Sequence, residues 1–195
     1  MSLLSWLTGS VFYDLWQHGR EIEPLIARKD ERVLSRSTPE LERHFDKTAV
    51  EQPRQNGFPV AFVMLLLLVA FALNLLSLLR LLPGLTPPLH ALAFFAPALV
   101  VLATTISSMF MLARGFSAGL AGFAYLFSGL LLVTVAQLVI NLLTGGGAAI
   151  PLLIALVALV GCRRLLNGEG FVVFALYCRT ARLTRVARTL RLKSR

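Results

Sequence analysis

Charged residues are scarce in this chain. They make up 15% of its 195 residues, whereas soluble globular domains contain roughly 25%. Between Gln55 and Cys162 the only charged residues are Arg80 and Arg114, and 56% of the whole chain is hydrophobic. This composition excludes a water-soluble enzyme, a secreted disulfide-rich protein and a disordered regulator. It predicts an integral membrane protein.

Residues that carry chemistry are also few. Cys162 and Cys178 form no CxxC pair, and the three histidines are scattered. No Asp, Glu or Lys falls inside a hydrophobic segment, although such groups are the usual mark of proton-coupled transport. Motifs of hydrolases, zinc proteases and nucleotide-binding proteins are missing as well. We therefore expect a protein that is not an enzyme, with no catalytic residue, no metal site and no cofactor.

Composition divides the chain into three parts. Residues 1–57 are mixed in charge, residues 58–166 are hydrophobic, and residues 167–195 form a basic tail. Residues 1–16 lack the basic start of a cleavable signal peptide, so the segment that begins at Phe58 is expected to act as the retained targeting signal.

The hydrophobic part predicts an all-α integral membrane protein with about four transmembrane helices. A helix needs about 20 apolar residues to cross the bilayer. The first three segments exceed this length, and the fourth reaches it only if Arg163 and Arg164 snorkel to the headgroups. Otherwise the fourth segment is re-entrant. The expected spans are residues 58–82, 89–113, 116–143 and 148–166.

The basic residues predict the orientation of these spans. They lie in the N-terminal region, in the tail and, through Arg114, in the turn between spans two and three. With four crossings, the positive-inside rule places these parts, and thus both termini, in the cytoplasm. The compact, Ala- and Leu-rich spans are typical of a bacterial inner-membrane protein.

The N-terminal region contains an apolar stripe at helical spacing, formed by Leu3, Leu7, Val11, Leu15 and Trp16. Such a stripe could lie in the membrane interface or dock a partner. It could equally pack on the cytoplasmic surface of the protein itself, and the sequence leaves these alternatives open.

The tail is predicted to be a basic amphipathic helix. Arginine recurs at every third position from residue 179, and on a helical wheel only Arg179 falls in the apolar sector. The tail and the two arginines before it are expected to contact anionic phospholipids of the inner leaflet. An acidic partner protein is the alternative, and no nucleic acid is expected because no base-reading module accompanies the charge. The arginines concerned are Arg163, Arg164, Arg179, Arg182, Arg185, Arg188 and Arg191.

Uncharged polar residues within the spans suggest a polar seam between the first and third helices. Asn74 and Gln137 should lie at comparable depth, and Asn141 should lie level with Arg80. We expect Asn74 to hydrogen bond Gln137, with Arg80 near Asn141. Such contacts usually hold helices together.

Small residues at the start of the third span form a helix-packing surface. Gly115 and Gly119 make a GxxxG pair, and Gly122 follows on a neighbouring face. Small residues allow close approach of helix backbones. The sequence does not say whether the second span or a neighbouring subunit packs there.

Together these features favour a non-catalytic membrane subunit, meaning a scaffold, assembly or accessory component of a larger inner-membrane complex. Its partners would be other membrane-protein subunits, bound through the cytoplasmic arms and the small-residue face. The alternative is a small oligomeric transporter or channel, in which copies of the chain build a pore lined by the polar seam.

Overall fold

The computed structural model describes residues 3–28, 30, 32–41, 57–80, 84, 86–145 and 149–193. Throughout these residues all regular structure is helical and no strand occurs, which confirms that the chain is all-α. The helices are α1 (Leu3–Thr8), α2 (Ser10–Arg28), α3 (Arg32–Ser35), α5 (Phe58–Arg80), α6 (Pro87–Ala113), α7 (Ser117–Thr144), α8 (Ala149–Leu166) and α9 (Glu169–Lys193).

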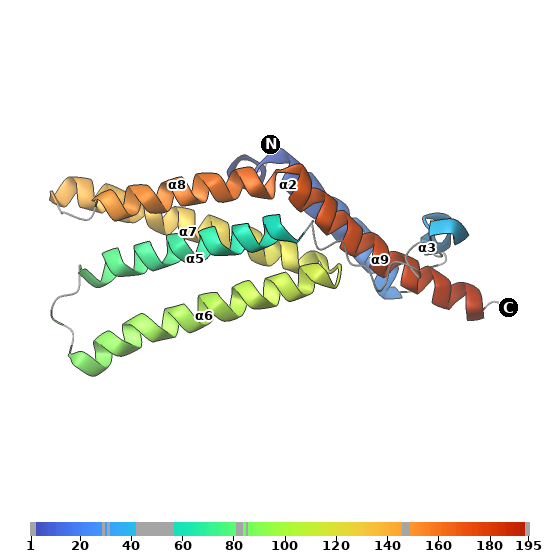
Figure 1. Cartoon of the computed structure of the whole chain (residues 1–195), viewed down its shortest axis with the longest axis horizontal. Helices are drawn as coiled ribbons and strands as arrows, with labels where there is room; N and C mark the ends of the chain where they lie inside the picture. Colours follow the sequence, from blue (N-terminus) through green and yellow to red (C-terminus); the bar gives the residue numbers. More distant parts are fainter. Residues whose placement is uncertain are drawn as a thin grey trace.

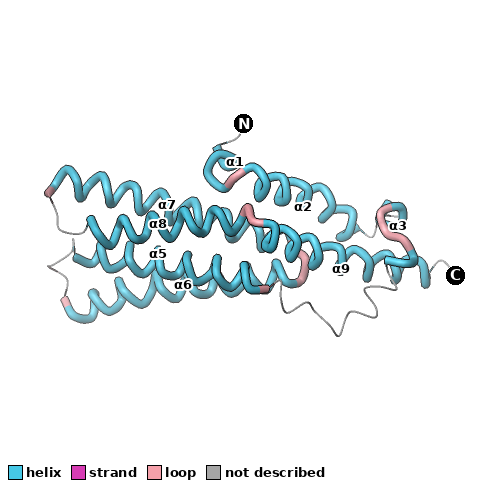
Figure 2. The backbone as a smooth tube through the Cα atoms, turned by 45° about the horizontal axis from the view of Figure 1, so that its top comes forward, coloured by secondary structure: helices cyan, strands magenta, loops and turns pink. Residues whose placement is uncertain are grey.

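Helices α5 to α8 lie side by side in a bundle (Figures 1 and 2), and all four are long and apolar enough to cross a membrane. Local sequence sets their ends. Prolines in the first turn start α6, where a missing N–H costs nothing. Gly145, in the left-handed conformation at φ 64°, ends α7. The shortest of these four, α8, has 18 residues and spans about 27 Å.

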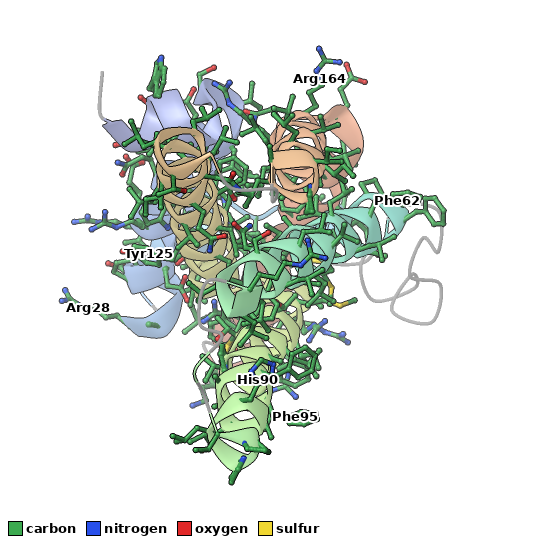
Figure 3. The ribbon with its side chains drawn as sticks, turned by 90° about the vertical axis from the view of Figure 1, so that its left-hand side faces the viewer. Arg28, Phe62, His90, Phe95, Tyr125 and Arg164 are labelled. Atoms are coloured by element: carbon green, nitrogen blue, oxygen red, sulfur yellow. The ribbon has the colours of Figure 1, made fainter. Side chains whose placement is uncertain are left out.

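Three of these helices supply most of the main core. Val63 and Leu67 of α5, Phe123 and Phe127 of α7, and Leu159 of α8 are all buried in one cluster. Large apolar side chains also cover the outside of the bundle: Phe62 of α5 and Phe95 of α6 point away from it (Figure 3) and are 41% and 60% exposed. Soluble monomers rarely expose broad apolar surfaces, so this exterior suits lipid.

Helix α6 is peripheral. Its buried residues are Thr105, Ser108 and Leu112, all in the half that leads to the α6–α7 turn. Between Pro87 and Thr104 none of its residues is buried. We call this stretch the outer half of α6.

Helix α9 leaves the bundle at the end that we call the arm end, and α2 lies along it (Figure 1). Ile22, Ile26 and Val33 from the N-terminal region pack with Leu183 and Ala187 of α9 in a second apolar cluster. The described parts of residues 1–57 and 167–195, which the sequence suggested as separate regions, thus pack together. The expected linker at residues 51–57 lies outside the described residues except for Gly57.

Candidate functional site

The polar residues of α5 and α7 meet inside the bundle. Asn74 is 2% exposed, and its Nδ2 donates to the carbonyl of Ala70 at 2.7 Å and to Thr134 Oγ1 at 2.8 Å. Thr134 in turn donates to the carbonyl of Leu130. The hydrogen-bond partner on α7 is thus Thr134, one turn before the Gln137 that we had expected. Depth estimated from residue counts is accurate to about a turn, which does not separate these two residues.

The other two residues of the expected seam lie closer to the ends of the helices. Asn141 is buried in α7, while Arg80 is exposed at the end of α5. Their pairing stays a prediction.

The small residues of α7 pack against α6 of the same chain. A Cβ added at Gly119 would lie 2.5 Å from the backbone nitrogen of Leu112 and 2.6 Å from the carbonyl oxygen of Ser108. A Cβ at Gly122 would overlap the Ser108 hydroxyl. The sequence left open whether this surface packs on the second span or on a neighbouring subunit. In the structure it packs on α6, which is the second span of the same chain. It explains why α6 is buried only in this half.

Gly115 has a different role, because it seats the α6–α7 turn on α9. Its φ is +77°, and an added Cβ would lie 2.5 Å from the carbonyl oxygen of Cys178. Both the backbone conformation and the close approach favour glycine at this position.

The carboxylate of Glu23 joins three segments at the arm end. It accepts from the backbone N–H of Ser117 at 2.7 Å, from the Ser117 hydroxyl, and from Arg182 Nη1 at 2.9 Å. Phe116, the N-cap residue of α7, makes no side-chain cap hydrogen bond. Glu23 therefore brings a negative charge from α2 to the positive end of the α7 dipole. Arg182 also lies 3.6 Å above the ring of Phe116.

These contacts determine the titration of Glu23. Burial by itself raises the pKa of the carboxyl, but the hydrogen bonds from Ser117 and Arg182 and the charge of Arg182 outweigh it. The net pKa is lowered, so the ionised form holds the three segments together.

Arg179 is buried between α9 and α2. It is 6% exposed, and its Nη2 donates to the carbonyl of Leu15 at 3.1 Å. Gly19 makes room, since an added Cβ there would lie 2.5 Å from the guanidinium. Burial lowers the pKa of Arg179, and the nearby charge of Glu23 opposes this effect.

The remaining arginines of the tail point either to the N-terminal region or to the outside of the molecule. Arg191 donates to the carbonyl of Ser37 at 2.6 Å and approaches that of Leu34 at 3.4 Å, so it lies at the end of α3. Arg185 and Arg188 are exposed. Arg179, Arg182 and Arg191 thus turn toward the protein's own N-terminal region, which a helical wheel of the isolated tail does not reveal.

Asn167, between α8 and α9, makes a second connection to the N-terminal helices. Its Oδ1 accepts from the N–H of Phe12 at 3.1 Å, and its Nδ2 donates to the carbonyl of Thr8 at 2.6 Å. Gly9, with φ +99°, lies so close to Asn167 that a Cβ there would overlap the side chain. We call α1 and α2, with their contacts through Glu23 and Asn167, the N-terminal clasp.

The arginines at the end of α8 lie beside this connection. Arg163 donates to the carbonyl of Trp6 at 2.9 Å. Arg164 is exposed and points outward at the edge of the molecule (Figure 3).

The N-terminal stripe is divided between the interior and the surface. Leu15 and Trp16 are buried in the main core, and Leu7 is half-buried. Val11 remains 46% exposed, and the side chain of Leu3 lies outside the described residues. Half of the stripe therefore packs on the protein itself, and the Val11 side is left for lipid or a partner.

Sequence reasoning did not find Glu23, Thr134 or Asn167. Asn167 precedes a glycine just after a helix, and this pair is a recognisable stop signal. Glu23 carries no local signal, because its partners are 94 and 159 residues away.

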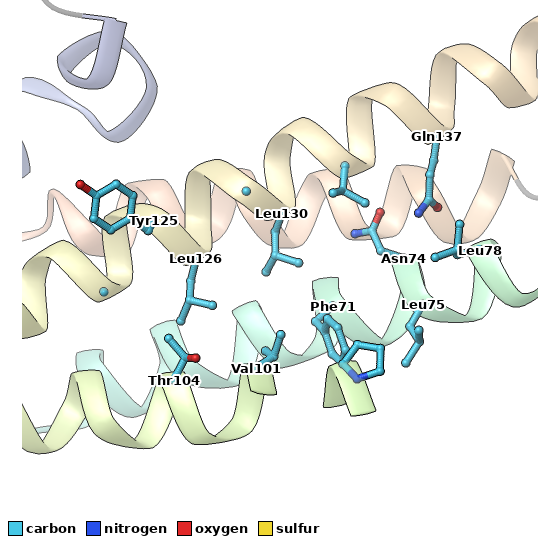
Figure 4. Close-up of a pocket in the computed structure, with 14 residues that line it drawn as sticks. Phe71, Asn74, Leu75, Leu78, Val101, Thr104, Tyr125, Leu126, Leu130 and Gln137 are labelled. Atoms are coloured by element: carbon cyan, nitrogen blue, oxygen red, sulfur yellow. The ribbon is translucent and has the colours of Figure 1, made fainter. Parts of the chain in front are cut away.

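A cavity of about 460 Å³ separates the outer half of α6 from α5 and α7 (Figure 4). Its wall is almost entirely apolar, and Asn74 and Gln137 provide the amide groups on it. The apolar residues that Figure 4 labels around it are Phe71, Leu75, Leu78, Val101, Leu126 and Leu130.

Within the described residues no group of three His, Cys, Asp or Glu could hold a metal ion. No family model, no curated protein and no solved structure matches this chain. Its function must therefore be argued from its own surfaces and cavities.

Proposed function

We propose that this protein is a non-catalytic, multi-pass subunit of a larger inner-membrane complex, in which it serves as a scaffold, assembly or accessory component. The observation that carries the proposal is the outer half of α6. None of the residues in this stretch is buried, although packing on neighbours is what holds a membrane helix in a defined place.

The exposed side chains of the outer half of α6 are large. Leu92, Phe95 and Leu99 are 62%, 60% and 65% exposed, and Phe94 and Phe95 stack edge to face with ring centroids 5.1 Å apart. A buried leucine side chain makes about 40–60 van der Waals contacts, so large side chains such as these would add much contact if a partner helix covered them. Because Gly119 and Gly122 already face α6 of this chain, the partner helix is expected on the outer half of α6.

The N-terminal clasp and α9 support the same proposal from the cytoplasmic side, where the positive-inside rule puts them. The N-terminal clasp fixes α2 against α9, so a partner would meet a preformed surface and lose less conformational freedom on binding. Arg164, Arg185 and Arg188 are exposed on this part of the molecule. They are the arginines that we expect to contact anionic phospholipids, at about 1 kcal/mol for each residue near the surface.

Photocrosslinking in native membranes tests the proposal. A photoreactive amino acid would replace Leu92 or Leu99, and the matched controls would replace Leu132 on α7 and Val157 on α8, which are 74% and 71% exposed. We expect one membrane protein to be captured from α6 alone and to co-purify stoichiometrically in mild detergent. Adducts with lipid alone at all of these positions would contradict the proposal.

A transporter or channel built from several copies is the second candidate, and the polar seam is the observation that favours it. Asn74 of α5 and Thr134, Gln137 and Asn141 of α7 are all buried. Adducts between two copies of this chain, together with solute flux in liposomes that Gln137→Leu abolishes, would favour this candidate over the subunit.

A further inference from the structure

A small pocket lies where α1 meets the outer side of α7 and α8, and we call it the α1 pocket. Its volume is about 140 Å³. Apolar side chains from the three helices make most of its wall, and Trp6 and Arg163 complete it; the apolar residues are Leu7, Phe127, Leu131, Leu159 and Val160. The pocket faces the surroundings of the protein, since Trp6 is 72% and Val160 51% exposed.

The guanidinium of Arg163 is held at the rim of this pocket. Its Nη2 donates to the carbonyl of Trp6 at 2.9 Å, which uses one of the five N–H donors of a guanidinium. Among the described residues the salt bridges are Arg32 to Asp30 and Arg182 to Glu23, so none of the described carboxylates neutralises Arg163. A guanidinium that is already oriented suits a phosphate, to which it can donate two parallel hydrogen bonds.

The depth of the pocket also fits a lipid. Arg163 lies three residues before the end of α8, about 21 Å along that helix, from where its side chain can reach the headgroup layer. Trp6 is of the residue type that is enriched in this layer. Val160 precedes Arg163 by about one turn of α8, on the side of the bilayer interior. An apolar pocket of this kind loses van der Waals contacts if it stays empty, and hydrocarbon is what surrounds it.

We propose that the α1 pocket binds one anionic phospholipid. The phosphate lies on Arg163 beside Trp6, and the first part of an acyl chain lies in the pocket against Leu131 and Val160. Arg163 provides the preference for this lipid, because a chain gains little by moving from the bilayer to an equally apolar wall. A free phosphate ion would have no use for that wall.

The inference rests on the phospholipid contacts proposed above and deepens them. It adds Arg163 to the exposed arginines and gives one lipid a defined position. Arg164, the next residue, is exposed but does not line the pocket. The two neighbouring arginines therefore differ in what they are expected to bind.

Fluorescence of the full-length protein tests the proposal, because bromine atoms quench a tryptophan that they touch. The chain has 2 tryptophans, and Trp16→Phe leaves Trp6 as the reporter. The protein would be reconstituted in vesicles of phosphatidylcholine and phosphatidylglycerol, with one of the two lipids brominated near the headgroup end of its chains. We expect the site beside Trp6 to prefer phosphatidylglycerol about fivefold, which is the effect of one basic residue near an anionic headgroup.

Two pairs of variants, made in the Trp16→Phe protein, separate the phosphate from the chain. Arg163→Gln should remove the preference, whereas Arg164→Gln, which removes the same charge one residue away, should keep it. Val160→Phe fills the pocket and should also reduce the preference severalfold. Val157→Phe is the matched control, because Val157 is 71% exposed on α8 and does not line the pocket.

Equal quenching by the two lipids before any of these changes would overturn the proposal. Equal losses in Arg163→Gln and Arg164→Gln would overturn it as well, because the attraction would then come from the general charge of this surface. Hydrogen exchange in α1 shows whether Arg163→Gln has released Trp6, and in that case Val160→Phe decides, with an unchanged preference counting against the pocket. None of these results alters the photocrosslinks expected from α6, so the two proposals fail separately.

Discussion

The ion pair between Glu23 and Arg182 should be worth several times more than an exposed one, and this chain contains both kinds. Glu23 and Arg182 are separated by 2.9 Å, with side chains 27% and 19% exposed. Asp30 and Arg32 are separated by 4.0 Å, with side chains 34% and 79% exposed. The perturbations are Glu23→Gln, Arg182→Met and their combination, with Asp30→Asn and Arg32→Met as the matched cycle.

The expected magnitude follows from the contacts. A hydrogen bond to a charged group is worth about 1.5–3 kcal/mol, whereas exposed ion pairs contribute about 0.2–1 kcal/mol. Arg182 also interacts with Phe116 and with the carbonyl of Gly115, but these losses cancel in a double-mutant cycle because Glu23 takes no part in them. We expect a coupling energy of about 1.5–3 kcal/mol between Glu23 and Arg182. Between Asp30 and Arg32 we expect about a few tenths of a kcal/mol.

The assay is reversible denaturant unfolding of the purified protein in mixed micelles, followed by circular dichroism. Hydrogen exchange at the Ser117 amide locates the effect, because Glu23 accepts from that N–H. A coupling energy for Glu23 and Arg182 no larger than that of Asp30 and Arg32 would refute the reasoning. It would mean that the clasp is held by its apolar contacts alone.

Four further outcomes can be checked. Gly115→Ala should destabilise the protein by about 1–2 kcal/mol or more, because the φ of Gly115 is +77° and an added Cβ would collide with the backbone of Cys178. Gly129→Ala, in an open helical position, should be neutral or should stabilise the protein by about 0.5–1 kcal/mol. Similar losses in both would contradict the packing. Asn167→Leu should release the clasp and speed hydrogen exchange in residues 3–28 but not in α8; equal exchange in wild type and variant would contradict this. Because the folded pKa of Glu23 is lowered, its contribution is complete above the ordinary value of about 4.5 and fades as pH falls below it. The difference in unfolding midpoint between wild type and Glu23→Gln should shrink from pH 7 to pH 3, and a constant difference would count against the assignment. Burial raises the pKa of the Cys178 thiol to about 11, so its alkylation at pH 8 should be slow in the wild type. Alkylation should be faster in Asn167→Leu, and an unchanged rate would mean that the clasp stays closed in this variant.

The helices of the bundle could be predicted because their signal is local and long. Each of the four is a long, predominantly apolar run bounded by proline, glycine or arginine, and the predicted ends agree with α5, α6, α7 and α8 to within a few residues. A run of this length has few alternatives to a membrane helix.

The contacts between segments could be predicted only in part. Gly119 and Gly122 were recognisable as a packing surface because close approach of backbones demands small residues, but the partner helix was left open. Thr134 was missed because a threonine within a membrane helix usually donates to its own backbone. It does so here, and it accepts from Asn74 as well.

The contacts between α2 and α9 could not be predicted from the sequence. Amphipathicity gave α9 one apolar face and left its arginines for a membrane surface. The structure instead uses Arg179 and Arg182 to bind α2, because a guanidinium can cross a helix interface where a glycine leaves room, as Gly19 does. No pattern within the tail reports the presence of Gly19 or Glu23.

The N-terminal clasp also has a consequence for the order in which the protein is made. Glu23 leaves the ribosome 159 residues before its partner Arg182. At roughly 5–20 residues per second, this interval lasts about 8–32 s. During that time Ile22 and Ile26 of α2 lack Leu183 and Ala187 of α9, against which they pack in the finished protein, so an early helix completes its packing only after a late one is made. A chain stalled before residue 182 would therefore present α2 to chaperones or to the bilayer surface, and only a completed chain would withdraw it.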